Sequence, residues 1–189
     1  MPEYTPAQQR GRTAYLGVAF MIMFTAFNSL QNIVSKIYSD YGYDNLGTAS
    51  VLLLYFVYGA FTFVAPFLIR NIGYKKSMFF SSLGYGIFEG AGLIIALWSD
   101  IPNTLGWIFV MVGAVFCGAG ASVIWVAQGS YVSDLASDEN RTKLFALFWG
   151  IMMSSQILGS ILTTFVLGLV STTTYFIVLT VLGCILFSI

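Results

Sequence analysis

Long stretches without a charged side chain are the feature that most constrains this chain. Five such stretches, at 13–35, 45–69, 77–99, 101–133 and 144–189, contain 23, 25, 23, 33 and 46 residues, and Glu89 is the one charge inside them. A helix that crosses about 30 Å of hydrocarbon needs roughly 20 apolar residues. Only 8% of the residues are charged, against about 25% in a soluble domain, which is too few to cover a surface in water. The sequence therefore predicts an integral membrane protein made of α-helices.

The last stretch is too long for a single crossing. Its 46 residues would form a helix about 69 Å long at 1.5 Å per residue. A glycine and a polar cluster at Gly168–Thr174 lie near its middle, and we expect the helix to break there. The expected fold class is all-α: a polytopic membrane domain at 13–189 after an N-terminal segment at 1–12. The six expected spans are 13–36, 47–70, 77–99, 104–133, 143–168 and 173–189, of which the last is short for a full crossing.

The distribution of basic residues predicts the orientation, because cytoplasmic loops carry an excess of Lys and Arg. With six spans, seven of the eight basic residues lie on the side of the N-terminus: Arg10, Arg12, Arg70, Lys75, Lys76, Arg141 and Lys143. The other side holds Lys36 beside Asp40, Asp44 and Asp100. We therefore expect the N-terminus in the cytoplasm or the equivalent inner compartment.

The sequence offers little for catalysis. It contains no histidine, the side chain most used for proton transfer near neutral pH, and its two cysteines, Cys117 and Cys184, lie inside apolar stretches. It has no nucleophile–base pair, metal-ligand spacing or phosphate-binding loop. We expect no enzyme activity, no cofactor and no metal site. The formal net charge of zero gives no reason to expect a nucleic-acid partner.

Polar residues recur at helical spacing in the first span. Thr25, Asn28, Gln31 or Asn32, and Ser35 form one stripe on a helix that is otherwise apolar. Polar side chains are expensive in lipid, so the stripe is expected to face other helices or water. Two interpretations stay open. The stripe lines a cavity or substrate path, or it forms hydrogen bonds between helices, which contribute about 0.6–2 kcal/mol each.

Glu89 lies in the middle of the third span, and the sequence places no Lys, Arg or His at a similar depth. One interpretation is a site for a proton or a cation. The other, which we favour, is a protonated carboxyl that donates a hydrogen bond to a neighbouring helix, because a single acid without a relay partner is a weak sign of transport.

The fourth and fifth spans combine small residues with a few large polar ones. Trp125 and Gln128 lie three residues apart on one face of the fourth span, and Gln156 lies in the fifth. These three side chains are further candidates for a substrate path. The pairs Gly150/Ser154 and Ser155/Gly159 have the small-xxx-small spacing that lets helices approach closely, so packing is the expected role of these four.

Several segments carry a family resemblance. The stretches Phe27–Asn32, Gly118–Ser122 and Ile124–Tyr131, followed by Glu139–Arg141, Phe148–Gly150 and Ser154–Gln156, resemble the unc-ninety-three-like family of the major facilitator superfamily. The resemblance implies the N-terminal six-helix half of that fold. The superfamily's loop between spans two and three is usually acidic-basic-x-Gly-basic-basic. Arg70–Lys76 keeps the glycine and the basic end but lacks the acid, which puts the gating role of that acid in doubt.

The resemblance implies more than one function, because relatives regulate potassium channels, escort receptors or move small solutes. Our leading hypothesis is a non-enzymatic accessory or regulatory subunit of a larger membrane assembly. The alternative is half of a small-solute transporter. Membrane lipid and another membrane protein, or a second copy or half, are the expected partners. A transporter is expected to show a continuous polar path from the first-span amides to Gln128, whereas a scaffold is expected to show these residues bonded to their neighbours.

Overall fold

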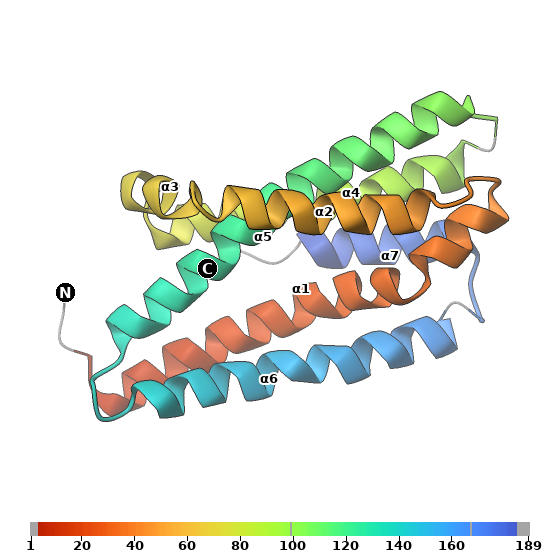
Figure 1. Ribbon diagram of the computed structural model, residues 1–189. Coiled ribbons are helices and arrows are strands. Elements are labelled where there is room, and N and C mark those ends of the chain that lie inside the picture. The colour runs from red at the N-terminus through yellow and green to blue at the C-terminus, as the bar shows by residue number, and fades with distance from the viewer. Residues whose placement is uncertain (1–3, 99, 167, 185–189) are drawn as a thin grey trace.

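A computed structural model describes residues 4–98, 100–166 and 168–184 of the chain, and the described residues form helices without strands (Figure 1). The helices are α1 (Pro6–Asp40), α2 (Leu46–Phe61), α3 (Ala65–Ile72), α4 (Tyr74–Leu97), α5 (Asn103–Leu135), α6 (Arg141–Ile161), the π-helical turn η1 (Leu162–Val166) and α7 (Thr172–Cys184). The predicted all-α fold class is therefore confirmed for the described part of the chain.

Local sequence signals explain where some of these helices begin. Thr5 caps α1 in a reciprocal pair with Gln8: the Gln8 backbone N–H donates to Thr5 Oγ1 at 3.3 Å, and the Thr5 backbone N–H donates to Gln8 Oε1 at 3.0 Å. Pro6 occupies the first turn, where its missing N–H costs nothing. Between α3 and α4, Gly73 has a φ of +84°, a conformation that favours glycine, and this lets the chain reverse within one residue.

Fewer than the six predicted membrane crossings are confirmed within the described residues. Four helical segments within the described residues are long and apolar enough to cross a membrane: 6–40, 74–97, 103–135 and 141–165. The pair α2 and α3 makes a fifth if it is counted as one span. The helix α7 is apolar but short, and part of the expected sixth span, 185–189, lies outside the described residues, as do Ser99 and Leu167 of the third and fifth. The sixth crossing stays a prediction.

The second span is not the continuous helix that we expected over 47–70. It breaks between Phe61 and Ala65, and the two parts meet at 67°. Pro66 lies in the first turn of α3. It lacks the backbone N–H that would donate to the preceding turn if α2 continued through this position. The Thr62 hydroxyl also donates to the carbonyl oxygen of Tyr58 at 2.7 Å, a local bond that often accompanies helix bending. The bend carries α3 across the ends of α4 and α5 (Figure 1).

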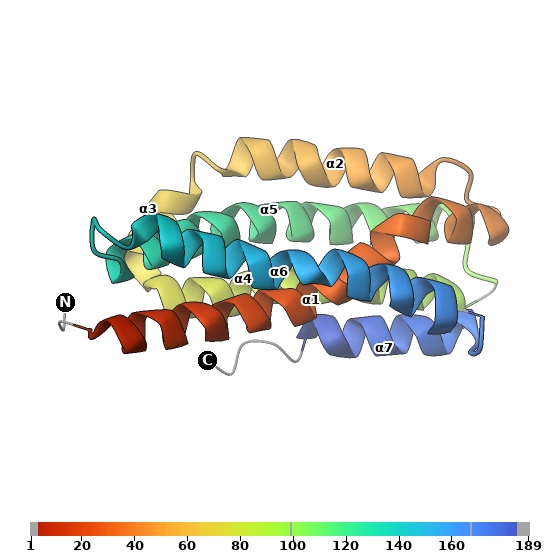
Figure 2. The ribbon, with the colours of Figure 1, turned by 90° about the horizontal axis from the view of Figure 1, so that it is seen from below.

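The pairing of the helices has an internal symmetry. The most extensive contact joins α4 to α5, and the other main contacts join α1 to α6, α2 and α3 to α5, and α4 to α7. We count α2 and α3 as one unit and exchange the first three units with the last three. The α1–α6 pairing then maps onto the pairing of α2 and α3 with α5, the α4–α7 pairing maps onto itself, and the α4–α5 pairing maps onto the smaller α1–α7 contact. Figure 2 shows α2 and α7 on opposite sides, with α1, α5 and α6 between them. Half of a major facilitator transporter has this arrangement of two inverted three-helix repeats.

Small residues allow close helix contacts, as the sequence predicted for the fifth span, which is α6. A Cβ at Gly120 would lie 2.5 Å from the Ser81 carbonyl oxygen of α4, and a Cβ at Gly159 would lie 3.1 Å from Asn28 Cβ of α1. The packing prediction is wrong for Gly150, which has no neighbour within 4 Å of a Cβ built on it. Gly150 is exposed because it lies away from the side of α6 that meets α1.

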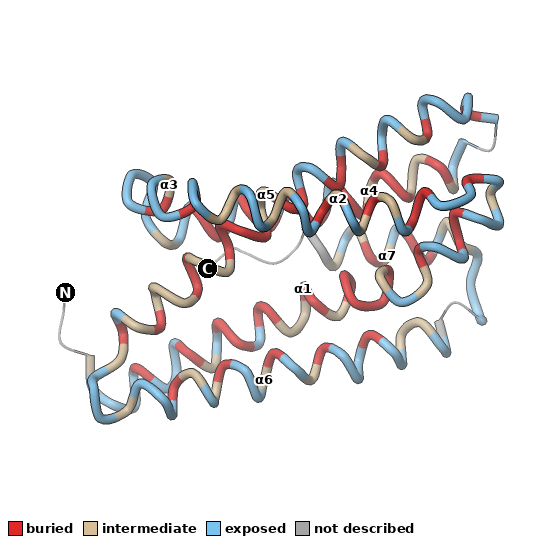
Figure 3. Tube along the Cα trace, viewed as in Figure 1, coloured by how far each residue is buried: buried red, intermediate tan, exposed pale blue. Residues whose placement is uncertain are grey.

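Burial differs strongly between the spans. In the most apolar window of α1, 67% of the residues are buried, but in that of α6 only 28% are, as the colours of Figure 3 also show. The helix α6 therefore packs mainly on α1 and leaves much of its surface uncovered. The N-terminus, the turn after α3 and the connection from α5 to α6 all lie at one end of the bundle (Figure 1), so the seven basic residues of these segments gather there.

Candidate functional site

Asn28 lies in a polar contact between α1 and α6. Its Nδ2 donates to Ser155 Oγ at 3.1 Å, and the neighbouring Ser29 hydroxyl donates to the Gly159 carbonyl oxygen at 3.0 Å. The Thr163 hydroxyl of η1 donates back to the Ser29 carbonyl oxygen at 3.1 Å. The small residues at positions 155 and 159 bring the two backbones close enough for these bonds. Asn28 is thus placed between helices, with its amide nitrogen bonded.

Gln31 and Ser35 face α2 instead. Gln31 Nε2 donates to the Tyr55 hydroxyl at 2.9 Å, and Ser35 Oγ lies 3.4 Å from Thr48 Oγ1. Asn32 is exposed and has no hydrogen bond to any described residue. Successive helix positions differ by about 100°, so Asn32 lies about 40° from Asn28 on the side away from Gln31, between the directions of Asn28 and Ser29, which both bond to α6.

Trp149 and Gln156 share one side of α6. The Trp149 ring stacks on the Trp125 ring of α5 at a centroid distance of 5.4 Å and an interplanar angle of 8°. Gln156 follows seven residues later, so it lies on the same side of the helix as Trp149, and it is exposed. We call the incompletely covered polar and aromatic side chains of α1, α2 and α6, namely Gln31, Asn32, Ser35, Tyr55, Trp149 and Gln156, the open face.

An aromatic layer separates this polar region from Gln128. The Phe20 and Phe24 rings of α1 lie 5.5 Å and 5.2 Å from the Trp125 ring, and the Phe20 ring lies 5.1 Å from the Phe148 ring of α6. Sequence analysis selected Trp125 but missed these phenylalanines, although the i,i+4 spacing of Phe20 and Phe24 was a usable signal. Aromatic side chains therefore join α1, α5 and α6 at this level.

Gln128 is buried below the aromatic layer, and its Nε2 has no hydrogen-bond partner among the described residues. Within that part of the chain, no series of hydrogen bonds connects Gln31 to Gln128. Of the seven candidates, the structure brings Gln31, Asn32 and Gln156 to the open face and Trp125 to its edge. Asn28 and Gln128 lie inside the bundle, and Glu89 lies elsewhere.

Glu89 is completely buried on α4, where α4 meets α7 and α1. The adjacent Gly92 lies against Phe176 of α7 and the Tyr38 hydroxyl of α1, and a Cβ at Gly90 would lie 3.8 Å from Thr180 Cγ2. Neither carboxyl oxygen of Glu89 has a hydrogen-bond partner among the described residues, so the expected bond to a neighbouring helix is not seen there. The hydroxyls of Tyr38 and Thr180 also lack partners in the described chain. This junction therefore contains three buried polar side chains with unmet hydrogen bonds.

We expect Glu89→Gln to change the melting temperature by no more than about 2 °C, because the amide has nearly the shape of the carboxyl and no hydrogen bond to a described residue is lost. Circular dichroism of the purified protein in lipid nanodiscs measures this. Glu89→Leu is the matched apolar control and is expected to change the melting temperature by a similarly small amount. A drop of several degrees in Glu89→Gln alone, or the loss of a pH-dependent current in proteoliposomes, contradicts a neutral carboxyl without partners and indicates a proton or cation site.

A cavity that no sequence pattern predicted opens at the basic end of the bundle. It measures about 350 Å³ and is lined by residues that include Arg12 and Tyr15 of α1, Tyr74 and Lys75 of α4, and Tyr131 of α5. The Arg12 guanidinium also lies 4.4 Å from the centre of the Tyr4 ring. Two cations and three phenols around one cavity are suited to a small aromatic or anionic solute.

Comparison with known proteins places these features in a family. The profile of the Major Facilitator Superfamily matches residues 16–189. The UNC93-like protein MFSD11 of Xenopus tropicalis is 32% identical over 149 residues, which are 77% of this chain and 31% of that protein. The protein unc-93 homolog A of Mus musculus is 30% identical over 163 residues, 80% of this chain and 33% of its own length. The "Putative potassium channel regulatory protein unc-93" of Caenorhabditis elegans is 28% identical over 164 residues, 82% of this chain and 21% of its length.

The chain thus spans about a third or less of these curated relatives. No solved structure matches it. The superfamily profile covers nearly the whole chain, the relatives share the unc-93 name, and the described helices pair as inverted repeats do. The chain therefore belongs to the major facilitator superfamily, and within it to the UNC93-like family.

Proposed function

We propose that this chain is a non-enzymatic accessory or regulatory subunit whose open face packs against another protein in a larger membrane assembly. The observation that carries the proposal is the pair of exposed amides, Asn32 and Gln156, on apolar helices. An amide left without partners in hydrocarbon costs several kcal/mol. A partner surface with hydrogen-bonding groups removes this cost.

The bonding of the remaining polar residues supports a scaffold rather than a pathway. Asn28 and Gln31 donate to neighbouring helices, and the aromatic layer around Trp125 lies between them and Gln128. The C. elegans relative is named for potassium channel regulation, and for this chain we take an ion channel or a comparable membrane protein as the class of partner.

The composition of the purified particle tests the proposal. In lipid nanodiscs, native mass measurement is expected to find the 20.7 kDa chain together with a second protein, either a different membrane protein or another copy. A photo-crosslinker at Asn32 or Gln156 is expected to join the two, whereas one at Phe109, exposed on α5, is expected to react with lipid. A lone chain in a native membrane, crosslinked only to lipid at all three positions, contradicts the proposal.

The alternative function is part of a small-solute transporter. The cavity of about 350 Å³ beside Arg12 and Lys75 is the observation that favours it. Reconstitution with the assembly's other chain distinguishes the two functions. Saturable uptake of an aromatic anion that is lost in Arg12→Ala supports transport, and a change in channel current without uptake supports regulation.

The proposed orientation places the N-terminus in the cytoplasm. Seven basic residues gather at that end of the bundle, and anionic inner leaflets retain such residues. A membrane-impermeant thiol reagent added outside cells is expected to label cysteine introduced at Asp44 or Asp100, but not at Lys75 or Arg141. The wild-type chain controls for native cysteines, and the reverse labelling pattern contradicts this orientation.

A further inference from the structure

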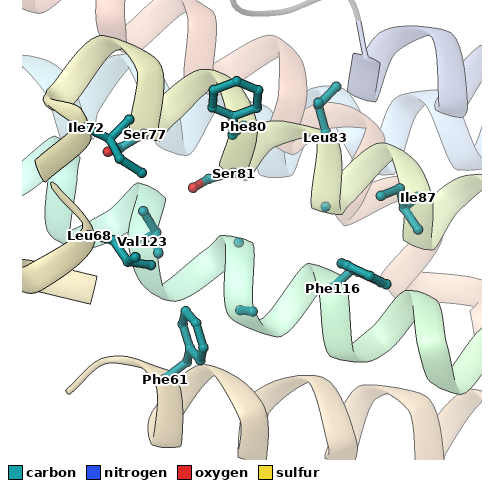
Figure 4. Close-up of a pocket in the computed structure, with 13 residues that line it drawn as sticks. Phe61, Leu68, Ile72, Ser77, Phe80, Ser81, Leu83, Ile87, Phe116 and Val123 are labelled. Atoms are coloured by element: carbon teal, nitrogen blue, oxygen red, sulfur yellow. The ribbon is translucent and has the colours of Figure 1, made fainter. Parts of the chain in front are cut away.

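The bend between α2 and α3 leaves a groove on the outside of the bundle that the proposed function does not use. Its volume is about 340 Å³, and its walls are α3, α4 and α5 (Figure 4). The wall residues are mostly large and apolar, among them Leu68 and Ile72 of α3, Phe80 and Ile87 of α4, and Phe116 and Val123 of α5. Gly84, Ala119 and Gly120 provide the floor, where α4 and α5 approach each other closely. We call it the α3–α5 groove.

Two serines in the α3–α5 groove have unmet hydrogen bonds. Ser77 and Ser81 are only 2% and 6% exposed and neither bonds to a described residue through its hydroxyl; the Ser77 hydroxyl oxygen is also fully buried. Ser82, in contrast, donates to the Phe79 carbonyl oxygen of its own helix at 2.7 Å. Figure 4 shows the Ser81 hydroxyl pointing into the groove and Ser77 at its end. A buried hydroxyl normally has a partner, so an apolar occupant with polar atoms near Ser77 is indicated.

The same end of the groove is positively charged. Lys76 lies four residues before Phe80, hence on the groove side of α4, and it is exposed. The first turn of α4 has no acidic residue and no side-chain cap, so its free N–H groups add to the positive potential. Arg70 ends α3 nearby. The acid of this region, Asp134, accepts a hydrogen bond from the Tyr74 hydroxyl and forms no ion pair with a described cation. A lysine at a helix N-terminus is unfavourable by itself, and an anion there offsets the cost.

The length of the groove indicates which kind of molecule it can hold. From Ser77 to Ile87 the lining residues of α4 extend about 15 Å at 1.5 Å per residue, which is half of the roughly 30 Å of bilayer hydrocarbon. That is the depth of one leaflet. A transmembrane helix of a partner is about 10 Å wide and extends through both leaflets, so it matches neither the length nor the volume.

We propose that the α3–α5 groove binds one acyl chain of an anionic phospholipid. The headgroup lies at Lys76 and the N-terminus of α4, and the Ser77 and Ser81 hydroxyls donate to ester or phosphate oxygens. The site belongs to the leaflet on the N-terminal side of the membrane. It shares no residue with the open face.

Native mass measurement of the protein released from nanodiscs tests the site. The probes are 1-palmitoyl-2-oleoyl phosphatidylglycerol and the phosphatidylcholine with the same chains. Wild type is expected to retain one phosphatidylglycerol. Lys76→Glu is expected to reduce that retention by about tenfold or more, since each basic residue near an anionic headgroup contributes about 1 kcal/mol. Retention of phosphatidylcholine is expected to stay within twofold. Ala119→Phe, which fills the floor, is expected to reduce retention of both lipids.

Matched controls separate the site from general effects. Lys143→Glu removes an exposed cation at the same end of the bundle, and Leu158→Phe fills a second apolar groove, of about 330 Å³, whose lining residues include no cation. Both are expected to retain phosphatidylglycerol as wild type does. Each variant's melting temperature is measured, and Val123→Phe replaces Ala119→Phe if the latter does not fold. Equal retention by Lys76→Glu and wild type, an equal loss in Leu158→Phe, or capture of a protein segment instead of lipid by a photo-crosslinker at Ile87 overturns the proposal.

Discussion

Replacing Gly118 by alanine is expected to destabilise the protein by about 3 kcal/mol, the upper part of the range for overpacking, and to lower its melting temperature by roughly 6–12 °C. Gly118 lies where α5 crosses α2. A Cβ at this position would overlap the Leu54 carbonyl oxygen and lie 2.9 Å from Val57 Cβ and 3.1 Å from the Tyr58 backbone nitrogen. Two of these atoms belong to the backbone of α2, so a side-chain rotation cannot relieve the overlap and the two helices have to separate.

Gly129 provides the matched control on the same helix. A Cβ built there has no neighbour within 4 Å, so Gly129→Ala is expected to be neutral or to stabilise by about 0.4–1 kcal/mol through the lower entropy of the unfolded chain. Thermal unfolding of both variants in the same nanodiscs compares them directly. Equal melting temperatures for Gly118→Ala and Gly129→Ala contradict the close contact between α2 and α5.

The double variant Asn32→Leu/Gln156→Leu is expected to weaken the assembly by about tenfold or more, since the loss of two interfacial hydrogen bonds costs about 1–3 kcal/mol. The direction of the change distinguishes a protein partner from lipid at these two positions. If these amides bond to a partner protein, leucine removes the bonds and leaves the partner's polar groups unpaired. If they face lipid, leucine is the better residue, and the melting temperature of the lone chain rises with no change in assembly.

The measurement is the fraction of chain recovered with its partner after purification in nanodiscs at several concentrations. Ile157→Ala serves as the control, because Ile157 is 68% exposed on α6 next to Gln156 but carries no hydrogen-bonding group. It is expected to leave the fraction assembled unchanged. A double variant that assembles like wild type and melts at a higher temperature contradicts a protein partner on the open face.

The sequence by itself determined the class of this protein. The lengths of the uncharged stretches predicted a helical membrane protein, and the helices found in the described residues lie within a few residues of most of the expected spans. These properties are local, because the hydrocarbon thickness and the backbone's need for internal hydrogen bonds act on each segment separately. The grouping of basic residues at one end could be predicted for the same reason, because successive spans place the connecting loops on alternate sides of the membrane.

The bend of the second span could not be read in this way. The 25 uncharged residues at 45–69 satisfy the length rule whether or not the helix breaks, and Pro66 permits a break without requiring one. The packing of α3 on α4 and α5 decides it, and the α3–α5 groove is a consequence. No pattern within 47–70 predicted the groove.

The roles of single polar residues also depended on the tertiary structure. Asn28 and Asn32 lie four residues apart on one helix and have the same chemistry, but Asn28 bonds to Ser155 while Asn32 is exposed. Gly150 and Gly159 both belong to small-xxx-small pairs, yet only Gly159 meets a neighbouring helix. The sequence specifies which side of a helix each residue occupies. What covers that side is decided by segments about 130 residues away in the chain, because a hydrogen bond or a close contact requires both partners in place.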